Sequence, residues 1–525
     1  MDFRDRQKLF DAVDGATFDL IVIGGGVTGA GVARDAAQRG LKVFLTEARD
    51  FASGTSSRSS KMIHGGLRYM AQGDLGLVQE AASERKAVER IAPHLTRLMP
   101  FIIPAKNAAV VAKLRTGMWA FEKLGGVPKA RRHEVWSRAD LEAKEPAVDA
   151  HDLTGAVVYP EYLTDDARLT LANIRTAVAD GAIALSYAPV QALVMDGERV
   201  AGVALSDALG DAGTVRARVL GRVIINAAGP WVDALRTLED GAAPTRLKLS
   251  KGVHLVVPHA KLPVNRTIIF PAHDKRSVFA VPRGDVTYIG TTDTFYPDAD
   301  YWPKITIEDV DYLLKASAAR FTSAPLKPAD ITSAWSGVRP LVAEEGKSAS
   351  EISRKDEIWS GPGGVLSIAG GKLTAYRKMA ERITDMAEEA LGRKLTKSRT
   401  ATTPLLSGDV DVDAAITSID ARAGADSERL VRLYGSEADV IASSGGGPAV
   451  EARHAVLNEG ALTLEDYWVR RSARAWFDID GGVTALAPAA EVMAALLGWS
   501  AAETRSQIDN CLAHRDETLS AMETA

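Results

Sequence analysis

Short apolar runs separated by glycine turns predict a βαβ unit near the start of the chain. Phe18 to Ile23 is an apolar run of strand length, and residues 30–39 have helical spacing up to Gly40. Residues 41–47 then form a second apolar run. Two such runs on either side of one helix are typical of parallel strands joined by a crossover helix.

Alternating apolar and polar positions predict antiparallel strands farther along the chain. Residues 184–208 and 214–219 alternate like the strands of hairpins, and residues 223–226 read as a buried strand that ends in a small-residue turn at 227–231. Four short alternating runs follow between residues 247 and 292. We expect these runs to form an antiparallel sheet inserted into the domain that the βαβ unit begins.

Helical spacing marks the remaining regions. Residues 77–91 and 110–124 have it, and a third helix is expected to begin at Asp165 or Asp166, one of which caps its N-terminus. From about residue 399 the composition changes to alanine, glutamate and arginine with helical spacing. The pattern therefore predicts a helical C-terminal domain.

The glycine turn after the first strand, Gly24 to Gly29, has the spacing of a dinucleotide-binding motif. Gly24 allows a tight turn, Gly26 lets the backbone approach a pyrophosphate, and Gly29 lets the helix pack closely against the strand. Glu47 is placed to accept hydrogen bonds from a ribose diol, and its charge would repel a 2′-phosphate. A glycine-rich turn in another kind of α/β protein is the alternative. We expect a dinucleotide here, with the helix N-terminus facing its phosphates.

The composition is that of a globular protein with a large core. The chain has 525 residues, of which 46% are hydrophobic, and a formal net charge of −5, which gives no basic field for nucleic acid. Its single cysteine, Cys511, excludes an internal disulfide framework, and its nine histidines show no metal-binding spacing. Because the sequence shows no signal peptide and no run of about 20 apolar residues, we expect a protein of the cytoplasm or of a membrane surface.

Residues 51–69 combine hydroxyl-bearing side chains and glycines with larger apolar side chains. Short hydrogen-bond donors and close backbone approach make a good cradle for the polar atoms of a cofactor. A flexible linker is the alternative, but Met62, Ile63, Leu67 and Tyr69 indicate that the segment is packed. We therefore expect it to contact the cofactor.

Part of this segment, Thr55 to Tyr69, carries a long and specific resemblance. Its sequence, TSSRSSKMIHGGLRY, closely resembles the signature of FAD-dependent, aerobic-type glycerol-3-phosphate dehydrogenases, which are members of the D-amino-acid-oxidase-like flavoprotein group. Residues 165–169 are similar to another stretch that is typical of this family.

The resemblance implies an α/β fold with a Rossmann-like FAD-binding domain, an inserted antiparallel-sheet substrate domain and a helical C-terminal cap domain. The expected boundaries are 17–95, 152–235 and 335–398 for the discontinuous FAD-binding domain, 96–151 and 236–334 for the substrate domain, and 399–525 for the cap. One glycine fingerprint without a second one for NAD favours a tightly held FAD over a diffusing nicotinamide.

The resemblance also implies a reaction, the oxidation of sn-glycerol 3-phosphate to dihydroxyacetone phosphate. Hydride would pass from C2 to N5 of FAD, and the electrons would pass on to a quinone. Two alternatives share the flavin scaffold: an oxygen-using glycerophosphate oxidase, and an oxidase of amino acids or amines. A flavin-binding protein without catalysis is a third alternative, which would leave a cationic pocket without a use.

The expected cofactor contacts come from the glycine turn, the hydroxyl-rich run and later segments that return to the same site. They are Gly24, Gly25, Gly26, Val27, Thr28, Gly29, Glu47, Thr55, Ser56, Ser57, Ser59, His64, Gly65, Gly66, Leu67, Val190, Ala228, Gly229, Trp231, Gly371, Lys372, Leu373 and Thr374.

The expected substrate contacts are Arg68, Tyr69, His254, Thr292, Arg339 and Lys372. Three of them, His254, Arg339 and Lys372, are expected to be catalytic, and the last two resemble family positions over the flavin ring. His254 is the expected base for the C2 hydroxyl, because an imidazole titrates near neutral pH. A structural histidine is the alternative.

An aromatic, apolar helix with basic flanks is expected at residues 114–124. Met118, Trp119 and Phe121 alternate there with lysine and arginine, which suits insertion into one leaflet of a membrane. A core helix fits equally well. Family members are peripheral membrane proteins, so the resemblance implies a membrane surface and a quinone as partners, and it allows for a homodimer.

Overall fold

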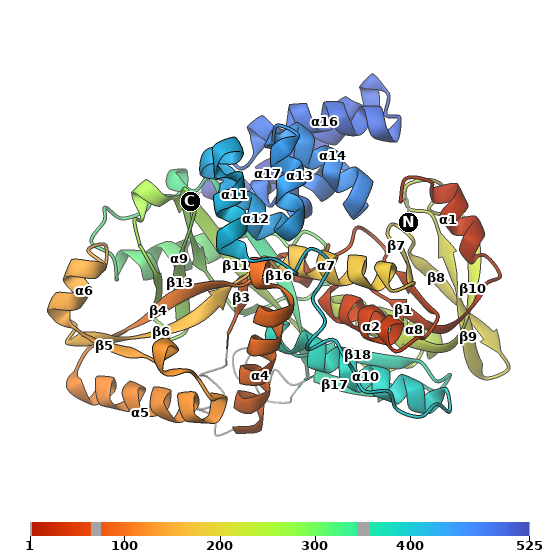
Figure 1. Cartoon of the computed structure of the whole chain (residues 1–525), viewed down its shortest axis with the longest axis horizontal. Helices are drawn as coiled ribbons and strands as arrows, with labels where there is room; N and C mark the ends of the chain where they lie inside the picture. Colours follow the sequence, from red (N-terminus) through yellow and green to blue (C-terminus); the bar gives the residue numbers. More distant parts are fainter. Residues whose placement is uncertain (1–2, 65–74, 344–355, 524–525) are drawn as a thin grey trace.

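The computed structural model describes residues 3–64, 75–343 and 356–523. In these residues the chain forms two mixed sheets, one of eight and one of ten strands, with helices around them. Figure 1 shows the C-terminal helices, drawn in blue, gathered above the sheets. The predicted α/β fold class is confirmed.

The eight-stranded sheet contains the predicted βαβ unit. The first strand pairs in parallel with the second and with the strand that ends at Asn226, and α2 crosses between the first two strands. Helices α7 and α10 pack beside α2 around one apolar core. The strands are β1 (Thr17–Ile23), β2 (Val43–Thr46), β7 (Ile183–Leu185), β8 (Val190–Asp196), β9 (Arg199–Ser206), β10 (Val215–Asn226), β17 (Asp356–Ser360) and β18 (Leu366–Gly370), and the helices are α1 (Arg6–Val13), α2 (Val27–Gln38), α7 (Asp166–Ala179), α8 (Val232–Glu239) and α10 (Tyr376–Ala390).

The ten-stranded sheet contains the predicted antiparallel runs but is larger than the sequence pattern indicates. Strands from before residue 247 and after residue 292 extend it, and the whole of β16 (Ser333–Val342) pairs in antiparallel register with β11 (Leu247–Pro258). The strands are β3 (Met62–Ile63), β4 (Arg97–Ala105), β5 (Glu134–Ser137), β6 (Gly155–Leu163), β11 (Leu247–Pro258), β12 (Thr267–Pro271), β13 (Ser277–Arg283), β14 (Val286–Gly290), β15 (Thr294–Phe295) and β16 (Ser333–Val342).

The predicted helices beside this sheet and in the C-terminal region are present. Asp165 caps the N-terminus of α7, where its side chain accepts from the N–H of Arg168. The helices are α4 (Leu75–Ile91), α5 (Ala108–Gly125), α6 (Arg138–Lys144), α9 (Ile307–Ala318), α11 (Val412–Ala423), α12 (Ser427–Tyr434), α13 (Ala438–Ser443), α14 (Gly447–Glu459), the π-helical η10 (Asp466–Arg471), α15 (Arg474–Phe477), α16 (Val483–Leu497) and α17 (Ala501–Glu523).

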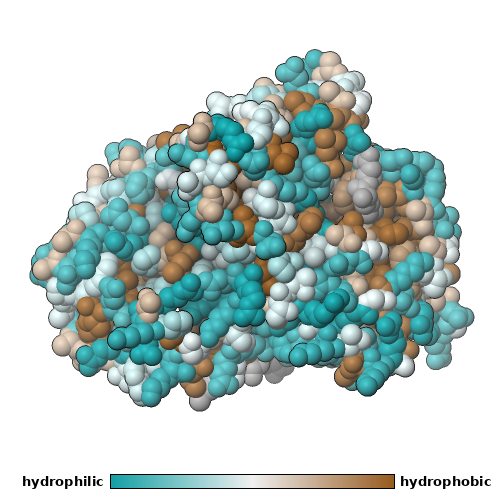
Figure 2. Space-filling view, viewed as in Figure 1, coloured by the Kyte–Doolittle hydropathy of each residue, from teal (hydrophilic) through white to brown (hydrophobic). Residues whose placement is uncertain are grey.

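Helix α5 is amphipathic, and Trp119 lies on a different face from Met118 and Phe121. Met118 and Phe121 are buried in the core beside the ten-stranded sheet, whereas Trp119 is 53% exposed. Figure 2 shows hydrophilic and hydrophobic residues mixed over the visible face, without a continuous apolar band. No helix of the described residues has both the length and the apolar composition that crossing a membrane requires.

Candidate flavin and substrate site

The glycine turn at the carboxyl end of β1 is built for close backbone approach. Gly24 has φ +110°, and a Cβ there would lie 2.6 Å from the carbonyl oxygen of Ala227, in the turn that follows β10. A Cβ at Gly29 would lie 1.9 Å from the oxygen of Gly24. Two of the three positions that the motif assigns to glycine therefore accept no other residue, and the 227–231 turn reaches the same place as predicted.

Gly26 is the N-cap of α2, and because it has no side chain it supplies no side-chain cap to the N–H groups of the first turn. The hydroxyl-rich run comes to this helix end, where Ser56 Oγ accepts from the N–H of Val27 at 2.9 Å. Such a helix end favours a negatively charged group such as a pyrophosphate. Gly25, Thr28, Ser57 and Ser59 lie in the same two segments.

Glu47 lies directly after β2 and faces the glycine turn. One carboxylate oxygen accepts from the N–H of Gly25 at 2.7 Å, and the other accepts from the N–H of Arg49 at 2.9 Å. Burial raises the pKa of Glu47, and these backbone donors oppose the rise. Each oxygen keeps lone pairs that can accept from ribose hydroxyls. Val190 is the first residue of β8. Two residues before it, the N–H of Ala188 donates a hydrogen bond to the backbone oxygen of Glu47 at 2.8 Å.

The run 55–64 leads from the glycine turn to the ten-stranded sheet. Thr55 Oγ1 donates to the oxygen of Val338 in β16 at 2.6 Å. The hydroxyl of Thr374 donates to the oxygen of His64 at 3.2 Å and accepts from its N–H, which joins the run to the turn before α10. Trp231 packs against Gly54, where a Cβ would lie 3.0 Å from its ring.

The remaining expected cofactor contacts of the described residues lie in turns at the ends of strands. Ala228 and Gly229 follow β10, and Gly229 has φ +56°. Gly371 follows β18, and Lys372 caps the short helix η7 (Leu373–Ala375) that leads into α10. Five expected site residues, Gly65, Gly66, Leu67, Arg68 and Tyr69, lie outside the described residues.

Arg339 and His254 lie on one face of the β11–β16 pair, above two glycines. In the register of these strands, Arg339 is opposite Ser250, and His254 is opposite Trp335. A Cβ at Gly252 would lie 2.0 Å from Nη2 of Arg339, and a Cβ at Gly290 would lie 2.1 Å from the ring of His254. The glycines therefore let both side chains lie flat against the sheet.

The guanidinium of Arg339 is held by the turn after β14. It lies 3.2 Å from Oδ1 of Asp293 and donates to Thr291 Oγ1 at 2.9 Å. The predicted substrate contact Thr292 is 2% exposed, and its hydroxyl accepts from the N–H of Val253 at 3.0 Å. Sequence reasoning singled out this turn but assigned no role to Asp293, whose position three residues after Gly290 was the available signal.

His254 is buried beside the hydroxyl-rich run. Its Nε2 lies 2.9 Å from Ser60 Oγ, and its ring stacks on Trp335 at 4.7 Å between centroids. Burial, with the charges of Arg339 and Lys61, lowers the pKa of His254 well below its usual value. The imidazole is therefore neutral at neutral pH, and its buried Nδ1 has no hydrogen-bond partner among the described residues. Neither Ser60 nor Trp335 was expected at this position.

A buried ion pair fixes the turn that presents Ser60. Nζ of Lys61 lies 2.6 Å from Oδ1 of Asp166, the first residue of α7, and Oδ2 of Asp166 accepts from the N–H of Ser59 at 2.9 Å. Lys61 and Asp166 are 1% and 0% exposed, so the pair is nearly inaccessible to water. The family-like stretch that begins α7 thus supports the run at 55–64.

These features together fit FAD. A glycine turn that excludes side chains, an open helix N-terminus, a carboxylate at the ribose position and an orphaned buried imidazole nitrogen are the groups that such a cofactor and its substrate would contact. The donors come from backbone, hydroxyls and carboxylate, which suits a dinucleotide.

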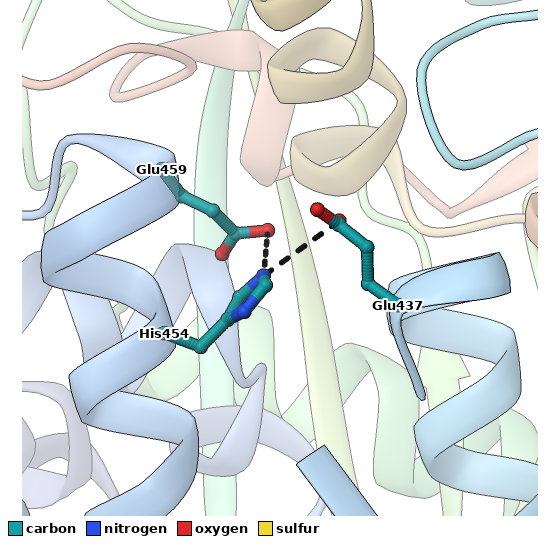
Figure 3. A group of neighbouring side chains, drawn as sticks. All are labelled: Glu437, His454 and Glu459. Atoms are coloured by element: carbon teal, nitrogen blue, oxygen red, sulfur yellow. Dashed lines mark ion pairs between the residues drawn. The ribbon is translucent and has the colours of Figure 1, made fainter. Parts of the chain in front are cut away.

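A separate polar cluster lies where the C-terminal helices meet α7 (Figure 3). Nε2 of His454 lies 3.7 Å from a carboxylate oxygen of Glu437 and of Glu459. These donor atoms could surround a cation, but Arg168 and Arg175 already pair with both carboxylates at 2.6 to 2.7 Å. The guanidinium groups would repel a metal ion, so we interpret the cluster as an ion-pair network.

Comparison with known proteins agrees with this site. Residues 19–377 match the model of the FAD-dependent oxidoreductases, and residues 398–504 match the C-terminal domain of alpha-glycerophosphate oxidase. The aerobic glycerol-3-phosphate dehydrogenase of Bacillus subtilis is 38% identical over 505 residues, which cover 91% of this chain and 90% of the relative.

Solved structures give the same result. The glycerol-3-phosphate dehydrogenase from Bacillus halodurans, complexed with FAD, superposes with a TM-score of 0.82 at 33% identity over 99% of both chains. The glycine oxidase from Geobacillus kaustophilus shares the fold, with a TM-score of 0.53 at 21% identity over 74% of this chain and 98% of that one. As the resemblance of residues 55–69 implies, the chain belongs to the aerobic glycerol-3-phosphate dehydrogenases of the FAD-dependent oxidoreductase family.

Proposed function

We propose that the chain oxidises sn-glycerol 3-phosphate to dihydroxyacetone phosphate, with FAD as its cofactor. The observation that carries this proposal is the pair of Arg339 and His254 on one face of β11 and β16, beside the hydroxyl-rich run. A cation and a neutral base side by side suit a substrate with oxygen ligands and a hydroxyl proton to lose. The names of the relatives support the choice of substrate.

In this reaction the side chains of the site have separate roles. Bound FAD would accept the hydrogen of C2 with its two electrons. His254 takes the proton of the C2 hydroxyl, for which the neutral imidazole is in the correct state. Arg339 holds a substrate oxygen and is itself aimed by Asp293 and Thr291. Lys372, Arg68 and Tyr69 are proposed as further contacts to the substrate.

The electron acceptor in this proposal is a quinone, and oxygen is the second candidate. The second candidate is favoured by one observation, the match of residues 398–504 to a domain named for alpha-glycerophosphate oxidase. Hydrogen peroxide formed in amounts equal to the oxidised substrate would favour oxygen. Turnover with a soluble quinone analogue and little peroxide would favour the quinone.

We also propose that the protein lies on a membrane surface, where a lipid-soluble quinone would reach it. Trp119 of α5 supports this, since it is 53% exposed and lies under Nζ of Lys123 at 4.6 Å. An indole next to a cation suits the interface of a bilayer with anionic headgroups. A homodimer remains a prediction that sedimentation of the purified protein would test.

Steady-state assays with an artificial dye as acceptor test the substrate. We expect turnover of sn-glycerol 3-phosphate, much slower turnover of glycerol, and none of glycine or proline. Faster oxidation of an amino acid would overturn the proposal and favour the amine-oxidase alternative. Dihydroxyacetone phosphate should be the product.

A further inference from the structure

The loop after β2, residues 47–53, is pressed against the glycine turn by three separate contacts. Oε2 of Glu47 accepts from the N–H of Gly25 at 2.7 Å. The ring of Phe51 lies where a Cβ at Gly25 would be 2.8 Å away. The N–H of Ala52 donates to the oxygen of Gly25 at 3.0 Å. Any shift of this loop would therefore move the turn that meets the cofactor.

The middle of the loop is held by the C-terminal domain. Asp50 is fully buried, and its carboxylate accepts from Nε of Arg470 and from Nη1 and Nη2 of Arg471, the last at 2.8 Å. Both arginines belong to the π-helical η10, more than 400 residues away along the chain. Planar guanidinium groups fix a carboxylate in position as well as in charge.

Both arginines are also held by further hydrogen-bond partners. Nη2 of Arg470 donates to Oδ1 of Asp466 at 2.7 Å, and the hydroxyl of Tyr187 donates to the same atom at 2.6 Å. Nη2 of Arg471 also donates to the backbone carbonyl oxygen of Glu459 at 2.8 Å. Asp50, Arg470 and Arg471, here called the clamp, therefore form a rigid network that excludes solvent. Removing one of these side chains would leave another buried charge without its partner.

A second ion pair joins the C-terminal domain to α7. Arg175 of α7 forms a bidentate pair with Glu437 at 2.7 Å, and neither residue touches the loop at 47–53. The two interdomain ion pairs differ in contact with the loop at 47–53 and in burial, since the side chains of Arg175 and Glu437 are 11% and 26% exposed. They form a matched pair for experiment.

We propose that Arg471, supported by Arg470, positions the Glu47 loop through Asp50, so that the C-terminal domain is a structural part of the FAD site. This inference rests on the proposed placement of the FAD ribose at Glu47. It assigns Arg471 as a positioning residue, with no contact to the substrate. The domain then affects how tightly FAD is held, independently of which substrate is oxidised.

The test is the affinity of the apoprotein for FAD, measured by flavin fluorescence on titration at a temperature where each variant is folded by circular dichroism. We expect Arg471→Met and Asp50→Asn each to raise the FAD Kd about tenfold. Arg175→Met should lower the melting temperature of the apoprotein and leave the FAD Kd unchanged. No substrate is present, so a wrong substrate would not alter the result.

The double variant decides whether Arg471 acts through Asp50. Since both substitutions disrupt the same Asp50–Arg471 pair, Asp50→Asn with Arg471→Met should bind FAD no more weakly than the weaker of the two single variants. Unchanged affinity in the folded single variants would overturn the proposal. Losses that multiply in the double variant would also overturn it, as would an equal loss in Arg175→Met, which would indicate general destabilisation.

Discussion

Asp293 alters what is expected of Arg339, the residue on which the proposed substrate site most depends. Its carboxylate lies 3.2 Å from the guanidinium, so part of the positive charge is already compensated before substrate binds. A phosphate dianion next to Asp293 would meet a negative charge, whereas a hydroxyl or a developing carbonyl would not. The pair therefore favours the hydroxyl end of the substrate as the ligand of Arg339.

Replacing Arg339 separates geometry from charge. Arg339→Lys keeps the charge but loses the fork that donates to Thr291 and faces Asp293. We expect kcat/KM to fall about ten- to two-hundredfold, which corresponds to a loss of roughly 1.5–3 kcal/mol of transition-state stabilisation. FAD should be retained. Similar losses for glycerol 3-phosphate and glycerol would support the hydroxyl, and a loss confined to the phosphorylated substrate would place Arg339 at the phosphate. Unchanged kinetics in Arg339→Met would remove it from the site.

Glu47 gives a residue-scale test of the cofactor site. Glu47→Gln keeps the size of the side chain but turns one accepting oxygen into a donor, which faces the N–H of Gly25 or Arg49. The loss of a charged acceptor costs on the order of 1.5–3 kcal/mol. We expect FAD to be lost on extensive dialysis, as measured by the flavin absorbance that remains. Full retention would contradict the assignment of Glu47 to the ribose.

Helix α5 shows how an element can be predicted while its orientation is not. The spacing gave the helix, and Met118 and Phe121, three residues apart, share a face that is buried, whereas Trp119 points away from it. Helical spacing alone places Trp119 on a different face from Met118 and Phe121. The prediction from sequence nevertheless grouped the three residues by their apolar and aromatic character. Membrane contact now rests on Trp119 and its basic neighbours.

Trp119→Ser tests that contact, and Met118→Ser is its control. We expect Trp119→Ser to reduce cosedimentation with anionic vesicles while activity with a soluble dye is unchanged, because the side chain is exposed. Met118→Ser should lower the melting temperature, since a buried side chain would become polar. Wild-type vesicle binding by Trp119→Ser would contradict the membrane proposal.

The limits of sequence reasoning at this scale follow from register. The glycine spacing, the position of Glu47 and the N-cap Asp165 are local sequence patterns and could be predicted, whereas the close approach of Ala227 to Gly24 joins distant segments. The contact of Ser60 with His254 depends on how β11 aligns with β16, which no local pattern specifies. The clamp on Asp50 depends on docking of a distant domain.

At the scale of the whole molecule, the stability of the C-terminal domain should depend on pH through His454, which lies 3.7 Å from Glu437 and Glu459 of the same domain. Although burial lowers it, the carboxylates of Glu437 and Glu459 raise the pKa of His454 to about 9, above about 6.5 for an unfolded histidine. This stabilisation is complete below pH of about 6.5 and is lost as the pH rises through 9. It amounts to on the order of 3 kcal/mol.

Thermal unfolding between pH 6.5 and 9 measures this effect. We expect the melting temperature of the wild type to fall over this window, and the fall to be smaller in His454→Gln. Arg168 and Arg175 keep their charge throughout. The pKa of His94 is lowered by burial to about 3, so that residue stays neutral in the window. An equal fall in the variant would show that His454 does not carry the dependence.

The most direct test of the central claim is titration of the FAD-loaded protein with sn-glycerol 3-phosphate in the absence of oxygen and of any acceptor. We expect stoichiometric bleaching of the flavin absorbance, with an equal amount of dihydroxyacetone phosphate formed. Arg339→Met should bleach far more slowly at the same substrate concentration. A flavin that stays oxidised with glycerol 3-phosphate but is bleached by an amino acid would contradict the proposed function.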